Sequence, residues 1–420
     1  MVSITVGCGE HITMTEKTST DMPDIESREQ GQRDLTVVGE NRTAEEREQS
    51  QNALFADMDL SKDVMAALDK LKLTRPTTVQ QLAIPILMAG RNLIAKAPTG
   101  TGKTFAFGIP LLEYLNMKER KVQNIILCPT RELALQICEE LKSIGQYIKG
   151  FRVAAVIGGQ DMNRQIQNLQ KNPQIVVATP GRLLDLLNRR QIDLSNIYTV
   201  ILDEADEMLS MGFIKDIRSI MDATPKDKQV ALFSATLSRE VMDISWEYIR
   251  DGAEIEVEPL AEDMPQIKQY LVSVPEKDKE KILLQIIEEN ELGRVMIFCN
   301  TKSKVERVTA ALKKRGLQAE ALHGDVPQRL RNRVMDGYRQ GFFHILVATD
   351  VAARGIDVND VEGVINYDVP SENEYYLHRI GRTGRARKQG VAFTLMAYTE
   401  KPRMEEILRY TRVQVDELEF

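Results

Sequence analysis

The stretch 97–104, with the sequence APTGTGKT, constrains the fold of this 420-residue chain more than any other. It follows the apolar run 93–95 and precedes the helix-compatible run 105–115. A strand, a glycine-rich turn and a helix N-terminus together make an anion cradle, because backbone N–H groups converge there and the helix dipole favours negative charge. The generic phosphate-loop pattern has glycine where Ala97 stands, so a tight turn before a buried helix is the alternative interpretation.

Within this stretch, each residue type has a chemical reason to be there. Gly100 and Gly102 let the backbone approach a ligand closely, since they carry no Cβ atom. The Lys103 ammonium can reach β- and γ-phosphates, and the Thr104 hydroxyl can ligate Mg²⁺. The candidate phosphate-binding set is Thr99, Gly100, Thr101, Gly102, Lys103 and Thr104.

A second candidate site is the acidic run 203–206, which directly follows the apolar run 200–202. In open α/β sheets, ligands bind beyond the carboxyl ends of the strands. There the Asp203 carboxylate can hold Mg²⁺ against phosphates, and Glu204 can orient and deprotonate a water. Standing alone, the run could be a simple acidic turn. Together with Lys103 and Thr104 it predicts a phosphate-cleaving site.

Short apolar runs alternate with helical segments along most of the chain, which is typical of parallel sheets covered on both faces. The predicted fold class is α/β, with two doubly wound parallel-sheet domains. We expect an acid-rich, disordered tail at 1–52, a first domain at 53–255, a linker at 256–266 and a second domain at 267–420. The expected strands are 92–95, 124–128, 152–156, 175–178, 199–202, 229–233, 267–272, 294–298, 318–321, 344–348, 363–367 and 390–395.

Composition excludes several classes of protein. No apolar run is long enough to span a membrane and no export signal is present, so we expect a cytoplasmic protein without membrane contact. The four cysteines form no CxxC pair, which disfavours a metal or disulfide framework. A net charge of −7 does not suggest a nucleic-acid partner, so any such surface must be a local basic groove.

The motifs occur in a characteristic order: the phosphate loop, the run DEAD at 203–206, SAT at 234–236 and HRIGRTGR at 378–385. In this order and spacing the chain closely resembles the DEAD-box RNA helicase family of superfamily 2, and most closely its bacterial, minimal-core members. The resemblance covers residues from about 55 to 420. It implies two tandem RecA-like domains with a cleft between them, and ATP and Mg²⁺ as cofactors. It also implies RNA-stimulated ATP hydrolysis, coupled to cleft closure and to local unwinding of short RNA duplexes or ribonucleoprotein remodelling.

The resemblance also implies roles at the nucleotide. Gln80, with Phe55 and the 76–77 turn, matches the Q motif that reads adenine. Leu73 stands where the family usually has an aromatic residue, which predicts apolar contact in place of stacking, and Pro98 stands where many members have glutamine. The family's remaining nucleotide roles fall on Lys103 and Thr104 for phosphates and Mg²⁺, Asp203 for Mg²⁺ through water, Glu204 as general base, Asp357 for the ribose, and Arg382 and Arg385 as arginine fingers.

For RNA, the matching positions are Arg131, Gly159, Thr179 and Arg182 in the first domain and Thr301, Arg331 and Thr349 in the second. Hydroxyls, backbone N–H groups and single arginines suit sugar–phosphate contact. Aromatic residues make up only 5% of the chain, so backbone binding with little sequence preference is expected, and contacts to 2′-hydroxyls would favour RNA over DNA. The family pattern couples the two sites through Asp206, Ser234, Thr236 and His378.

Parts of the HRIGRTGR motif also have structural interpretations that involve no catalytic role. The run of arginines could be a solvated basic helix face, and His378 could be a packed core histidine. Two other functions also stay open: a superfamily-2 motor that acts on DNA, and an ATP-gated RNA clamp that does not unwind. RNA is the expected partner, with ribonucleoprotein, RNA-decay or ribosome-assembly factors as further candidates, and we expect a monomer.

Overall fold

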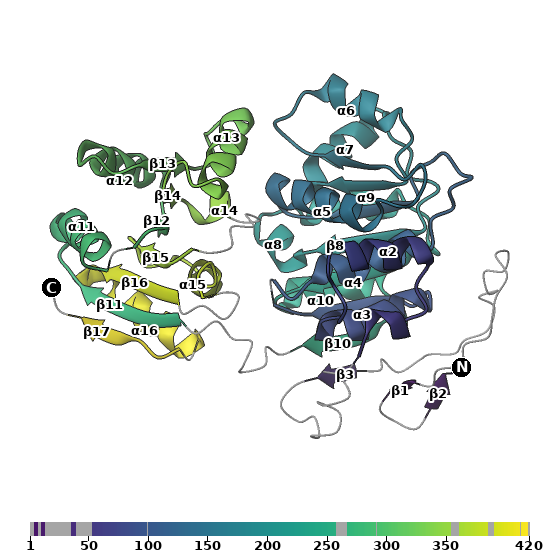
Figure 1. Ribbon diagram of the computed structural model, residues 1–420, viewed down its shortest axis with the longest axis horizontal. Coiled ribbons are helices and arrows are strands. Elements are labelled where there is room, and N and C mark those ends of the chain that lie inside the picture. Colours follow the sequence, from purple (N-terminus) through teal and green to yellow (C-terminus); the bar gives the residue numbers. More distant parts are fainter. Residues whose placement is uncertain are drawn as a thin grey trace. The chain divides into compact units, whose positions relative to one another are not determined.

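The computed structural model describes residues 53–98, 100–257, 267–290, 292–353, 361–384, 390–411 and 413–418, together with three short strands nearer the N-terminus (Figure 1). The chain divides into two compact units, one built on an eight-stranded sheet and the other on a seven-stranded sheet. All strand pairs within these two sheets are parallel. The predicted α/β fold of two doubly wound parallel sheets is therefore confirmed.

The first sheet places three motif-bearing strands side by side. β4 (Leu93–Lys96), β9 (Gln229–Ser234) and β8 (Thr199–Asp203) are neighbours in this order, with β9 in the middle. Because the strands are parallel, their carboxyl ends meet at one edge of the sheet. The other strands are β3 (Leu35–Val38) and β10 (Ala253–Val257) beyond β4, and β5 (Asn124–Leu127), β7 (Ile175–Ala178) and β6 (Val153–Val156) beyond β8.

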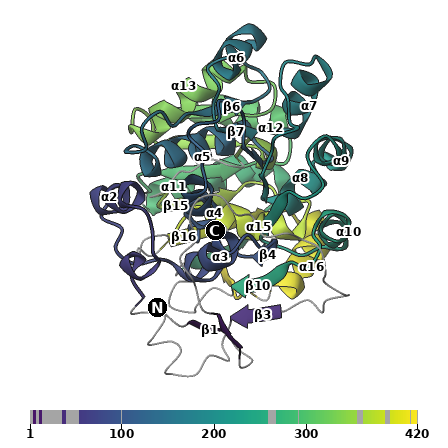
Figure 2. The same cartoon turned by 90° about the vertical axis from the view of Figure 1, so that its right-hand side faces the viewer.

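Helices cover both faces of this sheet, so its strands are apolar on both sides. The core on one face of the sheet includes side chains from five helices, several of which are labelled in Figure 2. These helices are α6 (Met162–Leu169), α7 (Pro180–Asn188), α8 (Ala205–Ser210), α9 (Ile214–Asp222) and α10 (Arg239–Tyr248). Towards the opposite face, Phe107 of α4 (Lys103–Glu113) meets the ring of Phe233 edge-on at 5.3 Å between centroids. The remaining helices of this unit are a short 3-10 turn (Phe55–Asp57), α2 (Lys62–Lys70), α3 (Thr78–Met88) and α5 (Arg131–Ile144).

The second sheet repeats this architecture with a separate core on each face. Its strand order is β13 (Ala319–Leu322), β14 (Ile345–Ala348), β12 (Val295–Phe298), β15 (Gly363–Asn366), β16 (Gly390–Met396), β11 (Ile267–Ser273) and β17 (Asp416–Leu418). One face packs against α11 (Lys279–Glu289) and α12 (Lys302–Lys314). The other packs against α13 (Gln328–Arg339), α14 (Asp350–Ala353), α15 (Asn373–Ile380) and α16 (Lys401–Thr411). Two 3-10 turns, Glu276–Asp278 and Tyr398–Glu400, precede α11 and α16.

The structure differs from the sequence-based expectation at three places. β10 was not expected and ends at Val257, inside the expected linker. It was not predicted because its buried residues alternate with glutamates and do not form a continuous apolar run. Within the tail predicted to be disordered, β1 (Ile4–Val6) pairs with β2 (Glu10–Ile12), and β3 pairs with β10. β17 adds an unpredicted edge strand to the second sheet, beside β11. The rest of the linker, residues 258–266, lies outside the described residues.

Candidate functional site

The loop after β4 has the backbone geometry of an anion cradle. Gly100 and Gly102 adopt φ angles of +85° and +87°, in the left-handed region that favours glycine, and Gly102 caps the start of α4. Lys103 opens that helix and is almost fully buried, with its Nζ donating to the Ala97 carbonyl at 3.3 Å. The Thr101 hydroxyl donates to the Pro98 carbonyl at 2.9 Å and so closes the turn. The loop therefore needs glycine at the two positions with positive φ, and it places Lys103 at the start of the helix.

Gln80 holds this loop from the side. Its amide nitrogen donates to the Gly102 carbonyl at 3.0 Å, and its amide oxygen accepts from the Thr77 backbone at 2.9 Å. The Thr77 hydroxyl donates to the Thr101 carbonyl at 2.8 Å. A Cβ atom at Gly102 would lie 2.5 Å from the Gln80 amide nitrogen, so the packing is close. Gln80, which the sequence assigns to adenine, is thus a direct support of the phosphate loop in this structure.

The other residues expected at the base differ in exposure. Phe55 is only 2% exposed, and its backbone N–H donates to the Thr74 carbonyl at 3.1 Å. Its ring is therefore buried in the core, and its contact with the base stays a prediction. Leu73, at the position where an aromatic residue was expected, is 36% exposed and remains accessible to a ligand.

Replacing Gln80 with alanine is expected to weaken ATP binding about tenfold, because one buried hydrogen bond contributes roughly 1.4 kcal/mol. Titration with a fluorescent ATP analogue measures the change. Gln81→Ala is the matched control, since this neighbouring amide donates to the Pro76 carbonyl at 2.9 Å. Equal losses in both variants would point to damage to α3 and not to the support of the loop.

The acidic run lies at the end of β8. Asp203 is 3% exposed, and burial raises the pKa of its carboxyl above the usual range, while the nearby Lys103 ammonium opposes that rise. Glu204 follows with φ of 52°, an uncommon conformation for a residue other than glycine, and its backbone N–H donates to Asp203 Oδ1 at 3.1 Å. Strained backbone of this kind is often found at functional sites. The turn places two successive acidic residues, Asp203 and Glu204, at the end of one strand.

A compact set of hydrogen bonds connects this run to the end of β9. Asp206 Oδ2 accepts from the Thr236 backbone at 2.8 Å and from the Thr236 hydroxyl at 2.9 Å. The Ser234 hydroxyl accepts from the Asp206 backbone at 3.2 Å. Next to it, the Ser234 carbonyl accepts from the Ala97 backbone at 2.9 Å, at the start of the phosphate loop. The expected hydrogen bonds of Ser234 and Thr236 to Asp206 are present, and they link both catalytic turns through β9.

The oxygen ligands at this edge suit a hard cation. The described residues contain no group of three or more His, Cys, Asp or Glu side chains that could hold a metal ion. A buried carboxylate, Asp203, and the hydroxyl of Thr104, which is 8% exposed, supply the oxygen chemistry that Mg²⁺ prefers. Mg²⁺ usually keeps several waters and binds through one or two protein oxygens and substrate phosphates, so this pair fits it.

Four of the residues assigned to RNA follow β5, β6 and β7, which are adjacent strands of the first sheet. The Arg131 side chain lies against Gly159, where an added Cβ would be 2.2 Å from Arg131 Nη1. Thr179 is the N-cap residue of α7, Pro180 is the first residue of that helix, and Arg182 follows two residues after Pro180. Helix N-termini and arginines are groups that commonly contact nucleic-acid phosphates.

Gly159→Ala is expected to lower RNA affinity several-fold while leaving ATP affinity unchanged, because the new Cβ must displace the Arg131 guanidinium. Gly159 has φ of +73°, so the change also strains the backbone. Gly90→Ala controls for that strain, since Gly90 has φ of +72° and an added Cβ there meets nothing within 4 Å. Fluorescence anisotropy with labelled RNA is the measurement, and equal RNA affinities of the two variants would contradict the role of Arg131.

In the second unit, the assigned residues again lie at strand ends. The Thr301 hydroxyl caps α12 by accepting from the Lys304 backbone at 3.3 Å, and Thr349 directly precedes α14. Arg331 of α13 is 8% exposed and donates to the carbonyls of His323 at 3.5 Å and Ala352 at 3.3 Å. Thr99, Asp357 and Arg385 lie outside the described residues.

Two described residues of the HRIGRTGR motif were assigned to coupling and to phosphate: His378, in the last turn of α15, and Arg382, two residues beyond its end. The Arg382 Nε donates to the His378 carbonyl at 3.3 Å, which keeps this side chain near the C-terminal turn of the helix. Both residues line one small cavity of about 10 Å³, together with Asp350 and Arg379. The structure thus brings His378 and Arg382 together.

Comparisons with known proteins agree with this arrangement. The model of the DEAD/DEAH box helicase family matches residues 77–244, and that of the helicase conserved C-terminal domain matches residues 278–387. The DEAD-box ATP-dependent RNA helicase CshA of Geobacillus kaustophilus is 42% identical over 364 residues, which span 87% of this chain and 78% of the relative. The chain belongs to the DEAD-box helicase family. CshA of Bacillus subtilis is 43% identical over 87% of this chain and 74% of its own.

Solved DEAD-box structures share the fold. Saccharomyces cerevisiae Dbp5, bound to RNA and ADP BeF3, superposes with a TM-score of 0.79 at 31% identity, over 87% of this chain and 95% of that one. Mss116, bound to ssRNA and UDP-BeF, gives a TM-score of 0.80 at 28% identity, over 92% and 82%. In the part of the chain that the structure describes, no helix is both long and apolar enough to cross a membrane.

Sequence reasoning missed one buried residue of this DEAD-box site. Arg379 is 1% exposed, although a run of arginines was weighed only as a solvated face or a set of fingers. The available signal was the helical spacing to Tyr376, which is buried three residues before Arg379. A charged residue at such a position is easily overlooked, since arginine is rarely fully buried unless it is paired.

Proposed function

We propose that the protein is an ATP-dependent RNA helicase, which hydrolyses ATP when RNA is bound and separates short RNA duplexes locally or remodels ribonucleoproteins. The observation that carries the proposal is the edge formed by β4, β9 and β8. It gathers Lys103, the Ser234–Thr236 turn and the Asp203–Asp206 run at neighbouring strand ends, connected by hydrogen bonds through Asp206. CshA, the relative at 42% identity, is named an ATP-dependent RNA helicase.

At the nucleotide, the proposed roles follow from position. The cradle amides and Lys103 bind the phosphates, while Gln80 keeps the loop in its binding conformation. Asp203 and Thr104 hold Mg²⁺, which neutralises phosphate charge when bound. Glu204 accepts the proton of the attacking water, because its turn places it directly after the metal-binding aspartate. Adenine recognition by Gln80 and ribose contact by Asp357 belong to the proposal as well.

The second unit supplies positive charge to the reaction in this proposal. Arg382 and Arg385 stabilise charge on the transferred phosphoryl group, the role of arginine fingers in related NTPases. RNA bound by both units brings these arginines to ATP, and hydrolysis then releases the strand. His378, Ser234 and Thr236 transmit the state of one site to the other.

The RNA proposal concerns the sugar–phosphate backbone. Arg131, Gly159, Thr179 and Arg182, which follow strands of the first sheet, contact one stretch of the RNA strand. Thr301, Arg331 and Thr349 of the second sheet's loops and helices contact the next. Both Dbp5 and Mss116 have been solved with RNA, which supports this class of partner. A monomeric state and a cytoplasmic location are part of the proposal and are tested by sedimentation and by cell fractionation.

Steady-state ATP hydrolysis without nucleic acid, with single-stranded RNA and with DNA of matched sequence tests the function. Strong stimulation by RNA alone, followed by separation of a short RNA duplex, is the expected result. Equal stimulation by DNA would assign the protein to a broader class of nucleic-acid motors. Tight ATP-dependent RNA binding without stimulated turnover would instead identify an RNA clamp.

A further inference from the structure

A buried arginine lies at the centre of the second unit's strand-end loops. Arg379 donates to both carboxylate oxygens of Asp350, at 2.6 and 2.7 Å, and its guanidinium lies over the Phe298 ring at 5.3 Å. Such a bidentate pair fixes orientation as well as adding energy. Because Arg379 belongs to α15 and Asp350 to α14, the pair locks two helices together.

The remaining N–H groups of Arg379 reach two further loops. Nη2 donates to Asn300 Oδ1 at 2.8 Å, and Nη1 donates to the Asp368 carbonyl at 2.8 Å. Asp350, Asn300 and Asp368 follow β14, β12 and β15, which are adjacent strands of the sheet. One side chain therefore connects the ends of three neighbouring strands to the helix that carries the HRIGRTGR motif.

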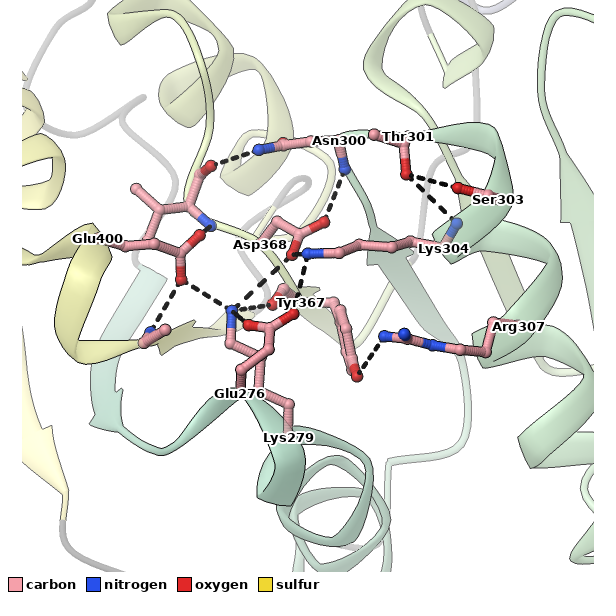
Figure 3. A network of polar contacts seen from close by, with 12 residues as sticks. Glu276, Lys279, Asn300, Thr301, Ser303, Lys304, Arg307, Tyr367, Asp368 and Glu400 are labelled. Carbon is pink, nitrogen blue, oxygen red and sulfur yellow. Dashed lines mark hydrogen bonds and ion pairs between the residues drawn. The ribbon is translucent and has the colours of Figure 1, made fainter.

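Two of its partners, Asn300 and Asp368, are themselves held in place by the network in Figure 3. The Asn300 backbone donates to Asp368 Oδ2 at 2.9 Å, and the Asn300 amide donates to the Val369 carbonyl at 2.8 Å. Asp368 is 1% exposed and accepts from Lys304 Nζ at 2.6 Å. Asn300 therefore cannot follow a shift of Arg379 without breaking these bonds, and the connection is stiff.

Two of the three partners adjoin residues assigned to RNA. Asn300 immediately precedes Thr301, and Asp350 immediately follows Thr349. Arg379 in turn lies three residues before Arg382, whose Nε donates to the last turn of the same helix. The route from the two threonines to Arg382 consists of covalent neighbours and charge-assisted hydrogen bonds.

We propose that Arg379 is a positioning residue that holds Arg382 at a fixed position relative to Thr301 and Thr349. RNA contact at the two threonines then controls the position of Arg382 within the second unit itself. This inference rests on the proposed function, because it gives a structural path to RNA stimulation. Arg379 touches neither substrate in this scheme. It acts through the loop of Asn300, the loop of Asp350 and the end of α15.

The test is a double-mutant cycle on RNA-stimulated ATP hydrolysis, using Arg379→Lys, Asn300→Ala and both together. Lysine keeps the charge beside Asp350 but cannot bridge three loops. Each single variant is expected to lower the maximal stimulated rate about tenfold, as loss of one charge-assisted hydrogen bond would, with the RNA concentration for half-stimulation unchanged. The double variant should match the singles, since both remove the same connection. Thermal unfolding reports whether each variant is folded.

Tyr376→Phe is the matched control, because it removes a hydrogen bond from the same helix to Gln269 at 2.9 Å, away from this connection. Its stimulated rate should stay within twofold of the unmodified protein. If Arg379→Lys does not fold, the cycle is run with Asn300→Ala and Asp350→Asn, for which the same lack of additivity is expected.

Additive losses, or an unchanged maximal rate in folded variants, would overturn the inference. A higher RNA concentration for half-stimulation at an unchanged maximal rate would also overturn it, because Asn300 would then simply contact RNA. These outcomes differ from failure of the proposed function, in which RNA does not stimulate the unmodified protein at all. That result would remove the inference together with the function on which it rests.

Discussion

Glu204→Gln should lower the maximal RNA-stimulated rate of ATP hydrolysis by about a thousandfold, within the range of roughly 10²–10⁴ that general bases contribute. Glutamine has the shape of glutamate but cannot accept the proton of the attacking water. The backbone turn should persist, because the bond from the Glu204 N–H to Asp203 Oδ1 does not involve the substituted side chain. Phosphate release measures the rate, and anisotropy measures ATP-dependent RNA binding, which the variant should retain.

Glu240→Gln serves as the control for this change. Glu240 is an exposed residue in the first turn of α10, so the same chemical substitution is made in the same unit away from β8. Its rate should equal that of the unmodified protein. A Glu204→Gln variant that hydrolyses ATP within fivefold of normal would exclude Glu204 as the base and direct attention to Asp203.

Arg382→Ala should reduce the same rate by about 10³-fold or more, since an arginine finger contributes roughly 10³–10⁵. Arg382→Lys should restore only a small part of it, because an ammonium lacks the planar fork of the guanidinium. ATP affinity should change little, as the stabilised charge develops during transfer of the phosphoryl group. Rates at saturating ATP and RNA, together with ATP titrations, separate these effects.

The control for Arg382 is Arg409→Ala, which removes an exposed arginine of α16 whose Nε donates to a carbonyl of its own helix at 3.3 Å. Loss of ATP affinity in place of rate would make Arg382 a ground-state binding residue. A normal rate would leave Arg385 as the remaining candidate for the finger.

The sequence predicted the parallel sheets well because buried parallel strands are continuous apolar runs, and each expected strand has a counterpart in the structure. β10 was not predicted, because its buried residues alternate with Glu254 and Glu256. That pattern is typical of a strand with one face more exposed than the other. Its assignment needed knowledge of its neighbours, β3 and β4, which no local pattern contains.

In the site, spacing was enough for the phosphate loop and the acidic run, since their chemistry depends on local backbone turns. For Gln80, spacing did not predict the contact with the phosphate loop. Whether a side chain faces a ligand or a neighbouring loop depends on contacts between segments far apart in sequence, such as the bond from Gln80 to Gly102. Arg379 is the same case, because its burial depends on three loops that meet only in the folded sheet.

The network around Lys279 also limits how this unit can vary. Lys279 is fully buried and bonds to Glu400 Oε2 at 2.8 Å and to the Tyr367 carbonyl at 3.0 Å (Figure 3). Removing one member leaves an uncompensated buried charge, whereas replacing the whole set with apolar residues can be neutral. Substitutions in this network are therefore expected to occur together, with one residue changing along with its ion-pair partner. An engineer who grafts this unit, or recombines it with a relative's, has to transfer Lys279, Asp368 and Glu400 as one block.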